Sequence, residues 1–170
     1  MLAAFDMATR AQLVAAGWRL LEVPAGLTLA GLRAAGAPFK SGKYFSQHAP
    51  TAREAAFPGG EIAYRPGLLP DSLNQPYGRA QELASGLARL LPDGARGTVA
   101  PAALYTWLLW EHHRQHGEWL LRQCYTWAVD EWQDTHLIVG AMGMERPIIV
   151  SPLPEGYGRG VGLMPVIVPG

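Results

Sequence analysis

The chain of 170 residues has a single cysteine, Cys124, which excludes an intramolecular disulfide and a zinc site built on several cysteines. Chains without disulfides are typical of reducing compartments, so we expect a cytoplasmic protein. The longest uncharged apolar stretch, residues 98–110, is shorter than the roughly 20 residues of a membrane-spanning helix. The opening MLAAFDMATR lacks the basic start and the apolar core of a signal peptide. We therefore expect no membrane partner.

Basic clusters are missing as well. Lysine occurs only at Lys40 and Lys43, and the other basic residues are arginines spread singly along the chain. The 14 basic residues balance 14 acidic ones, so the formal net charge is zero. Nucleic-acid binding needs a clustered basic surface, and we therefore expect no nucleic-acid partner.

The chain does contain enough apolar material for a core, since 49% of its residues are hydrophobic and 16% are charged. A chain of this length buries about 70% of the surface that its unfolded form exposes. Its 20 glycines and 14 prolines predict many turns. We expect a single domain over residues 1–170, with a helical hairpin in 1–36, an irregular linker-like segment in 37–60 and an α/β core in 61–170.

The clearest predicted element is a helix over about residues 101–117, with the sequence PAALYTWLLWEHHRQHG. Pro101 is typical of a first helical turn, and Gly117 is typical of the left-handed position that follows a helix. Apolar residues cover every side of the first two turns, which predicts burial all round. We expect this central helix to lie between the N-terminal helices and a C-terminal β-layer, with its polar end emerging from the core.

An amphipathic helix is predicted over residues 6–22, capped by Asp6 or Thr9, from the helical spacing of its apolar residues. These residues are Met7, Ala11, Val14, Trp18 and Leu21. Thr28 opens a second short helix over 29–35, which Gly36 closes. The two helices form a predicted hairpin whose apolar face packs against the rest of the chain or binds a partner.

The middle of the chain predicts a β-α-β unit after the irregular segment 37–60, in which residues 43–46 are a short strand. A strand over 61–65 leads into a helix over 76–91, with Asn74 as the N-cap, and then into a strand over 98–100. The C-terminal region predicts antiparallel strands over 121–129, 136–142, 146–151 and 161–168. Pro165 marks the last of them as an edge strand or a bulge. The fold class is therefore α+β with one mixed sheet.

Two histidines suggest a metal site, because His112 and His116 stand four residues apart on one helical face, a spacing that suits two ligands of one zinc ion. A third ligand must come from elsewhere, from His48, His136, Cys124 or an acidic residue. The HExxH pattern is absent, which excludes the metalloprotease geometry. The alternative is that these histidines cap the negative end of the helix.

A second candidate site is the loop between the strand 61–65 and the following helix, because a helix N-terminus beyond a strand offers unpaired N–H groups to an anion. The residues predicted to bind a ligand there are Arg65, Asp71, Ser72, Asn74 and Tyr77. The alternative is that Asp71, Ser72 and Asn74 only satisfy turn and cap hydrogen bonds.

Other patterns carry weaker signals for chemistry. Cys124 lies among apolar neighbours and is typical of a small buried hydrophobe. Trp127 and Trp132 near Asp130, Glu131 and Asp134 suggest a carbohydrate site, although such tryptophans are as typical of a core. The glycine patterns GAPFKSGKY and GYGRGVG match neither a P-loop nor a dinucleotide fingerprint.

Together these patterns favour a small non-catalytic binding or assembly domain that acts through protein–protein contacts, with a protein partner or a second copy of the chain. The first alternative is a small enzyme, either zinc-dependent through His112 and His116 or working at the loop near Arg65. The second is a structural protein of a viral or other assembly. The sequence predicts no other cofactor.

Overall fold

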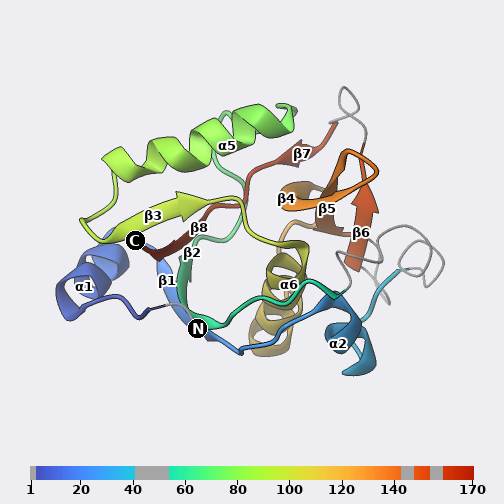
Figure 1. The fold of residues 1–170 in the computed structure, drawn as a ribbon, viewed down its shortest axis with the longest axis horizontal. Helices are drawn as coiled ribbons and strands as arrows, with labels where there is room; N and C mark the ends of the chain where they lie inside the picture. The colour runs from blue at the N-terminus through green and yellow to red at the C-terminus, as the bar shows by residue number, and fades with distance from the viewer. Residues whose placement is uncertain (1–2, 41–53, 143–147, 154–158) are drawn as a thin grey trace.

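The computed structural model describes residues 3–40, 54–142, 148–153 and 159–170. In these residues the chain forms four α-helices and two four-stranded sheets, which confirms the predicted α+β class (Figure 1). None of the helices in the described ranges combines the length and the apolar character that crossing a bilayer requires.

The first sheet is antiparallel and has the order β1-β2-β8-β3. Its strands are β1 (Arg19–Val23), β2 (Gly60–Tyr64), β3 (Ala95–Thr98) and β8 (Val166–Pro169). One face carries Ala63 and Ile167, which pack with Phe5, Leu13 and Trp18 in a cluster around helix α1 (Met7–Ala15). The other face belongs to the main core of the molecule.

The second sheet has the order β6-β5-β4-β7 and is mixed, because β7 pairs with β4 in parallel. Its strands are β4 (Tyr125–Trp132), β5 (Thr135–Ala141), β6 (Ile148–Pro152) and β7 (Val161–Gly162). Strands β4 to β6 are antiparallel neighbours, as predicted. Gln133 and Asp134 both have positive φ, 48° and 58°, which fits a tight hairpin turn between β4 and β5.

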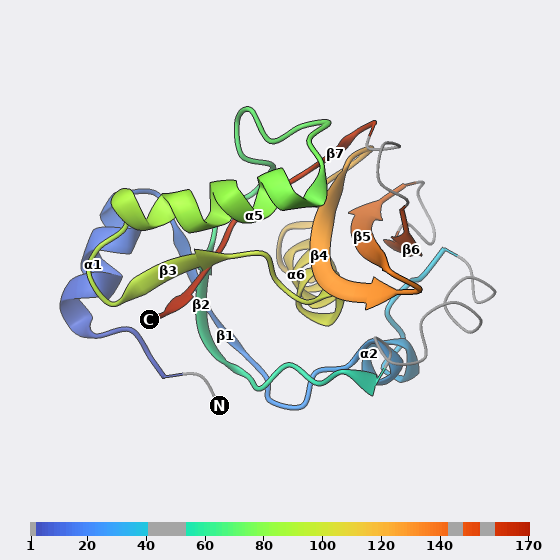
Figure 2. The ribbon, with the colours of Figure 1, turned by 45° about the horizontal axis from the view of Figure 1, so that its top comes forward.

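Helix α6 (Ala102–His116) lies between the two sheets, as Figure 2 shows. Gly117 follows it in the predicted left-handed conformation, with a φ of 74°. The apolar half of α6 is buried except for Trp107 and Trp110, which are half-buried. The core around it takes side chains from β2 and β8 of the first sheet and from β5 and β6 of the second. The prediction of a buried central helix is confirmed.

The structure does not confirm the N-terminal helical hairpin. Helix α1 ends at Ala15, and β1 stands between it and helix α2 (Leu29–Ala34). Gly17, at a φ of 83°, turns the chain out of the helix, and residues 19–23 then pair with β2 along their whole length. The predicted caps are present, since Asp6 accepts a hydrogen bond from the Thr9 amide and Thr28 accepts one from the Gly31 amide.

The β-α-β unit is split by a strand from the C-terminus. Helix α5 (Tyr77–Gly86) and a 3-10 turn, η1 (Leu87–Arg89), connect β2 to β3. Both strands are antiparallel to β8, so β2 and β3 run parallel to each other with β8 between them. Strand β3 also starts earlier than predicted, at Ala95.

The last predicted strand, 161–168, is divided between the two sheets. Residues 161–162 form β7 at the edge of the second sheet, and 166–169 form β8 inside the first. Pro165 therefore lies at the crossing and not on an edge strand, and its missing N–H interrupts no ladder there. The prediction of one sheet for the C-terminal strands is corrected to two.

Two further expectations differ in their boundaries. Strand β4 begins at Tyr125 and not at Leu121, because Leu121 and Gln123 have positive φ, 54° and 65°, which interrupts an extended strand. The predicted strand 43–46 lies outside the described residues. At the ends of segment 37–60, Phe39 and Phe57 are buried in the main core.

Candidate functional site

The loop between β2 and α5, predicted as a ligand site, runs along β7. The Leu69 amide donates to the Leu163 carbonyl (2.7 Å), and the Asn74 amide donates to the Val161 carbonyl (2.6 Å). The loop therefore pairs with the segment that leads into the crossing between the sheets.

Ser72 and Asn74 attach this loop to β7 through their side chains. The fully buried Ser72 hydroxyl donates to the Leu69 carbonyl (2.7 Å) and accepts from the Leu163 amide (3.0 Å). Asn74 Oδ1 accepts from the Gly160 amide (2.8 Å). Asn74 is not the N-cap of α5, a position that Pro76 occupies. The Ser72–Leu69 hydrogen bond is of the turn type that the alternative predicts, whereas the other two bonds join the loop to residues far along the chain.

Arg65 and Asp71 lie apart from these contacts. The Arg65 guanidinium donates to the Ala16 carbonyl and lies 4.5 Å from the centroid of the Trp18 ring, so it stabilises the turn between α1 and β1. Asp71 is exposed and adopts a left-handed conformation, with a φ of 62°. The Arg65 side chain therefore contacts the turn between α1 and β1 and not the polar residues of its own loop.

Tyr77 faces the β4–β5 hairpin. Its ring stacks on His136 with the centroids 3.3 Å apart, and it meets Trp127 edge-on at 6.1 Å. His136 Nε2 lies 3.2 Å from Glu131 Oε1. The Tyr77 hydroxyl accepts from Gln81 Nε2 (3.1 Å), and burial raises the pKa of Tyr77. The five predicted ligand residues thus lie in three places. Asp71, Ser72 and Asn74 belong to the loop beside β7, the Arg65 side chain contacts the α1–β1 turn, and Tyr77 contacts the β4–β5 hairpin.

The histidines at the end of α6 lie together, with the ring centroids of His112 and His116 4.4 Å apart. His112 is buried, and its Nδ1 lies 3.5 Å from the Tyr64 hydroxyl. Burial lowers the pKa of His112, and the neighbouring His116 lowers it further. His113 stacks on Trp119, 4.1 Å between centroids.

A third ligand for this pair is not found in the part of the chain that the structure describes. No three His, Cys, Asp or Glu side chains of the described residues are grouped so that they could hold a metal ion. His48 lies outside those residues, and His136 is stacked on Tyr77 on another element. The zinc hypothesis therefore rests on His112 and His116 alone.

Cys124 and the tryptophans beside the acidic turn have packing roles. Burial raises the pKa of the Cys124 thiol, which is opposite to the change that activates a nucleophile. Trp127 is buried and its indole donates to the Gln75 carbonyl (3.0 Å), so its ring cannot stack on a sugar. Asp130 accepts from the Ala102 amide at the start of α6, and burial raises the pKa of its carboxyl.

Among the residues that the structure describes, the most exposed large apolar side chain lies on α1. Met7 is 86% exposed, Val14 is 57% exposed, and Ala11 lies between them on the same helical face. Leu90, 81% exposed, belongs to the turn after η1. That turn adjoins α1, because the Thr9 hydroxyl donates to the Asp93 carbonyl (3.2 Å). We call Met7, Ala11 and Val14 the α1 face.

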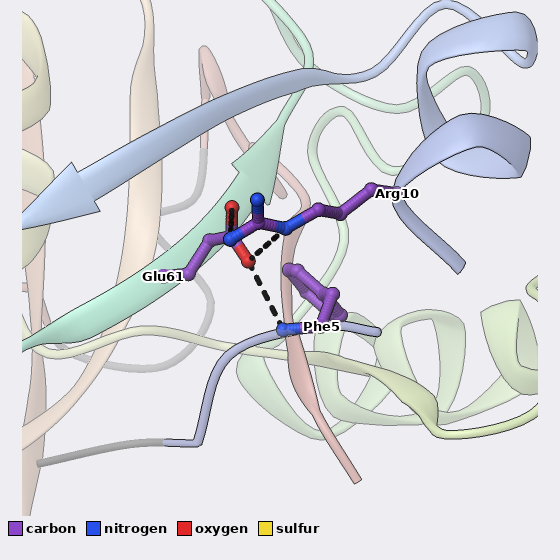
Figure 3. Close-up of polar contacts among 3 residues, drawn as sticks. All are labelled: Phe5, Arg10 and Glu61. Carbon is purple, nitrogen blue, oxygen red and sulfur yellow. Dashed lines mark hydrogen bonds and ion pairs between the residues drawn. The ribbon is translucent and has the colours of Figure 1, made fainter. Parts of the chain in front are cut away.

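Helix α1 is fixed to the first sheet by a buried carboxylate (Figure 3). Glu61 of β2 accepts from the Phe5 amide (3.0 Å) and from Arg10 Nε (3.1 Å), and Arg10 Nη2 lies 3.0 Å from its other oxygen. Phe5 and Leu13 pack beneath the helix. Thr9 and Leu13, on the side of α1 opposite this face, are buried, so the α1 face is held toward solvent.

Comparison of the chain with protein-family models, with curated proteins and with solved structures finds no match.

Proposed function

We propose that the protein is a non-catalytic assembly domain that associates with a second copy of the chain through the α1 face. The observation that carries the proposal is the exposure of Met7 and Val14 on one side of a helix whose other side, with Thr9 and Leu13, is buried. Large exposed apolar side chains gathered on one element are typical of an interaction surface.

The chemistry of the α1 face suits a copy of itself. Its residues carry no charge, so a two-fold contact brings no like charges together. Ala11 lies between the two larger side chains, and its small size lets a second helix approach closely. Arg10, the basic residue of α1, is paired with Glu61 within the same chain. An apolar, uncharged face opposite an identical one fits an isologous dimer.

The test is the mass of the full-length protein in solution at a series of concentrations, by size-exclusion chromatography with light scattering. Wild type is expected to shift from monomer to dimer as its concentration rises. The double substitution Met7→Glu and Val14→Glu places four like charges in the dimer contact and is expected to leave a monomer. Both side chains are exposed, so the fold is expected to be retained.

The matched control is Ala8→Glu and Gln12→Glu, which adds the same charge to exposed positions of α1 about 100° away from the face. This control is expected to dimerise like wild type. A wild type that stays monomeric up to about millimolar concentration, or a Met7 and Val14 variant that dimerises unchanged, would overturn the proposal.

We also propose that the domain works in the cytoplasm. The single cysteine supports a reducing compartment, because a protein that relies on its core alone needs no disulfide. Labelling the protein in its host cells and locating it by fractionation tests this assignment.

A further inference from the structure

A small polar pocket of about 200 Å³ lies between α5, β3 and the edge of β4, away from the α1 face. It includes none of the histidines at the end of α6. Its lining includes Tyr77, Gln81 and Ser85 of α5, Arg96 and Gly97 of β3, and Val129 of β4.

The pocket owes its position to a close approach of α5 to β3. A Cβ on Gly97 would lie 2.3 Å from the Ala84 carbonyl oxygen, so only glycine allows this contact. Tyr77, Gln81 and Ser85 follow one another at intervals of four along α5 and line the same side of the helix. Gly97 therefore places this polar row beside β3.

Among the residues that the structure describes, Arg96 is the only charged one in the lining of the pocket. It is exposed, and its guanidinium has no ion-pair or hydrogen-bond partner among the described residues. A guanidinium offers five donors in a planar fork that matches the two oxygens of a carboxylate. The pocket thus contains one uncommitted positive charge.

Neutral donors stand on the α5 side of the same pocket. The Tyr77 hydroxyl accepts from Gln81 Nε2, which leaves its own proton free to donate. The Ser85 hydroxyl is exposed in the lining. Thr98, by contrast, donates to the Val99 carbonyl (3.1 Å) and contributes only acceptor oxygen.

The acidic groups nearby have partners of their own. Glu131 pairs with His136, and Glu82 pairs with Arg79 at 2.7 Å. Asp130 accepts from the first amide of α6. The described residues that line the pocket include no carboxylate, so the charge of this lining is complementary to an anion.

We infer that this pocket binds a small organic monocarboxylate. The carboxylate lies on Arg96, with Ser85 and Tyr77 as further donors, and a short apolar end lies against Val129 and Ala84. The volume is smaller than the 300–1,000 Å³ of typical ligand pockets, so it suits a ligand of a few heavy atoms. This inference does not depend on the assembly proposal, because none of the pocket residues belongs to the α1 face.

The experiment is an NMR titration of the ¹⁵N-labelled full-length protein with butyrate. Saturable amide shifts are expected at Ser85, Gly97 and Val129. In Arg96→Gln the affinity is expected to fall at least about ten-fold, because the charge-assisted hydrogen bonds are lost. Arg89→Gln, at an exposed arginine of η1 outside this pocket, is the matched control and is expected to bind like wild type.

Two further probes define the ligand class. Butyramide, which has the same size without the charge, is expected to give no saturable shift. Inorganic phosphate is expected to bind more weakly than butyrate because it lacks the apolar end.

Three results would overturn the inference: absence of saturation with butyrate, equal binding of butyramide or phosphate, or unchanged butyrate affinity in Arg96→Gln. The Met7 and Val14 variant is expected to bind butyrate like wild type, so a failure here is distinguishable from a failure of the assembly proposal.

Discussion

Glu61 is the acidic side chain that the first sheet buries, at 7% exposure, and it has partners for both oxygens. Without these partners its charge would be costly to bury. The contact joins two segments that are far apart along the chain, the α1 region and β2. It also orients α1, on which the proposed function depends.

Replacement of Arg10 by Ala is expected to lower the free energy of unfolding by about 1–3 kcal/mol. The substitution leaves the Glu61 carboxylate buried with the Phe5 amide as its remaining partner. Urea unfolding followed by circular dichroism measures the change. Arg79→Ala removes an exposed pair with Glu82 and is the control, with an expected loss below about 1 kcal/mol. Equal losses in the two variants would contradict this role of Glu61.

At the scale of the element, α6 combines two opposing effects at its C-terminal end. Histidines in a last helical turn are favoured in the charged form by the helix dipole. His112 is nevertheless buried beside Tyr64, with His116 and Arg19 nearby and Glu118 as the opposing negative charge, so its pKa is lowered. His112 lies just before the last turn of α6, where the dipole is weaker, and burial sets the direction of its pKa shift.

The free energy of unfolding is expected to fall as the pH drops below about 6.5, the ordinary pKa of histidine. The folded state binds its proton on His112 only at lower pH than the unfolded state does, so acid favours unfolding. Urea unfolding between pH 7.5 and 5 measures this dependence. In His112→Gln, which stays neutral and polar, the slope over that range is expected to be smaller, whereas a slope equal to that of wild type would contradict the prediction.

Elements differ in how far local sequence determined them. Helix α6 was predicted with its boundaries, because Pro101, Gly117 and an apolar surface on every side are signals that lie within the helix itself. The predicted helix 6–22 was wrong after Ala15, because a helical spacing of apolar residues continued through Trp18 and Leu21 into a segment that pairs as β1. Pairing with β2 outweighed the local pattern.

At the scale of the whole molecule, α6 joins the two sheets through one core. Leu108 is buried in the cluster that contains Ile62 of the first sheet and Leu137 of the second. The Tyr105 hydroxyl donates to the Met164 carbonyl (2.9 Å), which fixes α6 to the crossing between β7 and β8. We therefore expect the two sheets to unfold together.

Replacement of Leu108 by Ala is expected to lower the free energy of unfolding by about 2–5 kcal/mol, because it leaves a cavity in the shared core. Amide hydrogen exchange is expected to accelerate in β2 and in β5 by similar factors. Leu90→Ala, at an 81% exposed position, is the control and is expected to change stability by less than about 0.5 kcal/mol. Faster exchange confined to one sheet would show that the sheets unfold separately.

The candidate sites were likewise predictable only where local sequence signals determined them. Tyr77 was predicted as a ligand residue from its place at the start of a helix, but the pocket that it lines also includes Arg96 from β3, which carries no motif. The pocket forms beside β3 because Gly97 allows α5 to pack closely on that strand. Arg65, predicted for the same site, contacts Trp18 instead.

The sequence by itself determined the α+β class, the buried helix α6 and the caps of α1 and α2, because these depend on residues within a few positions of one another. Only the tertiary structure decided that residues 19–23 form a strand, that residues 161–169 are divided between two sheets, and that Met7 and Val14 face solvent. Each of these depends on a partner far along the chain, and local spacing carries no information about which distant segment will supply the hydrogen bonds or cover the apolar surface.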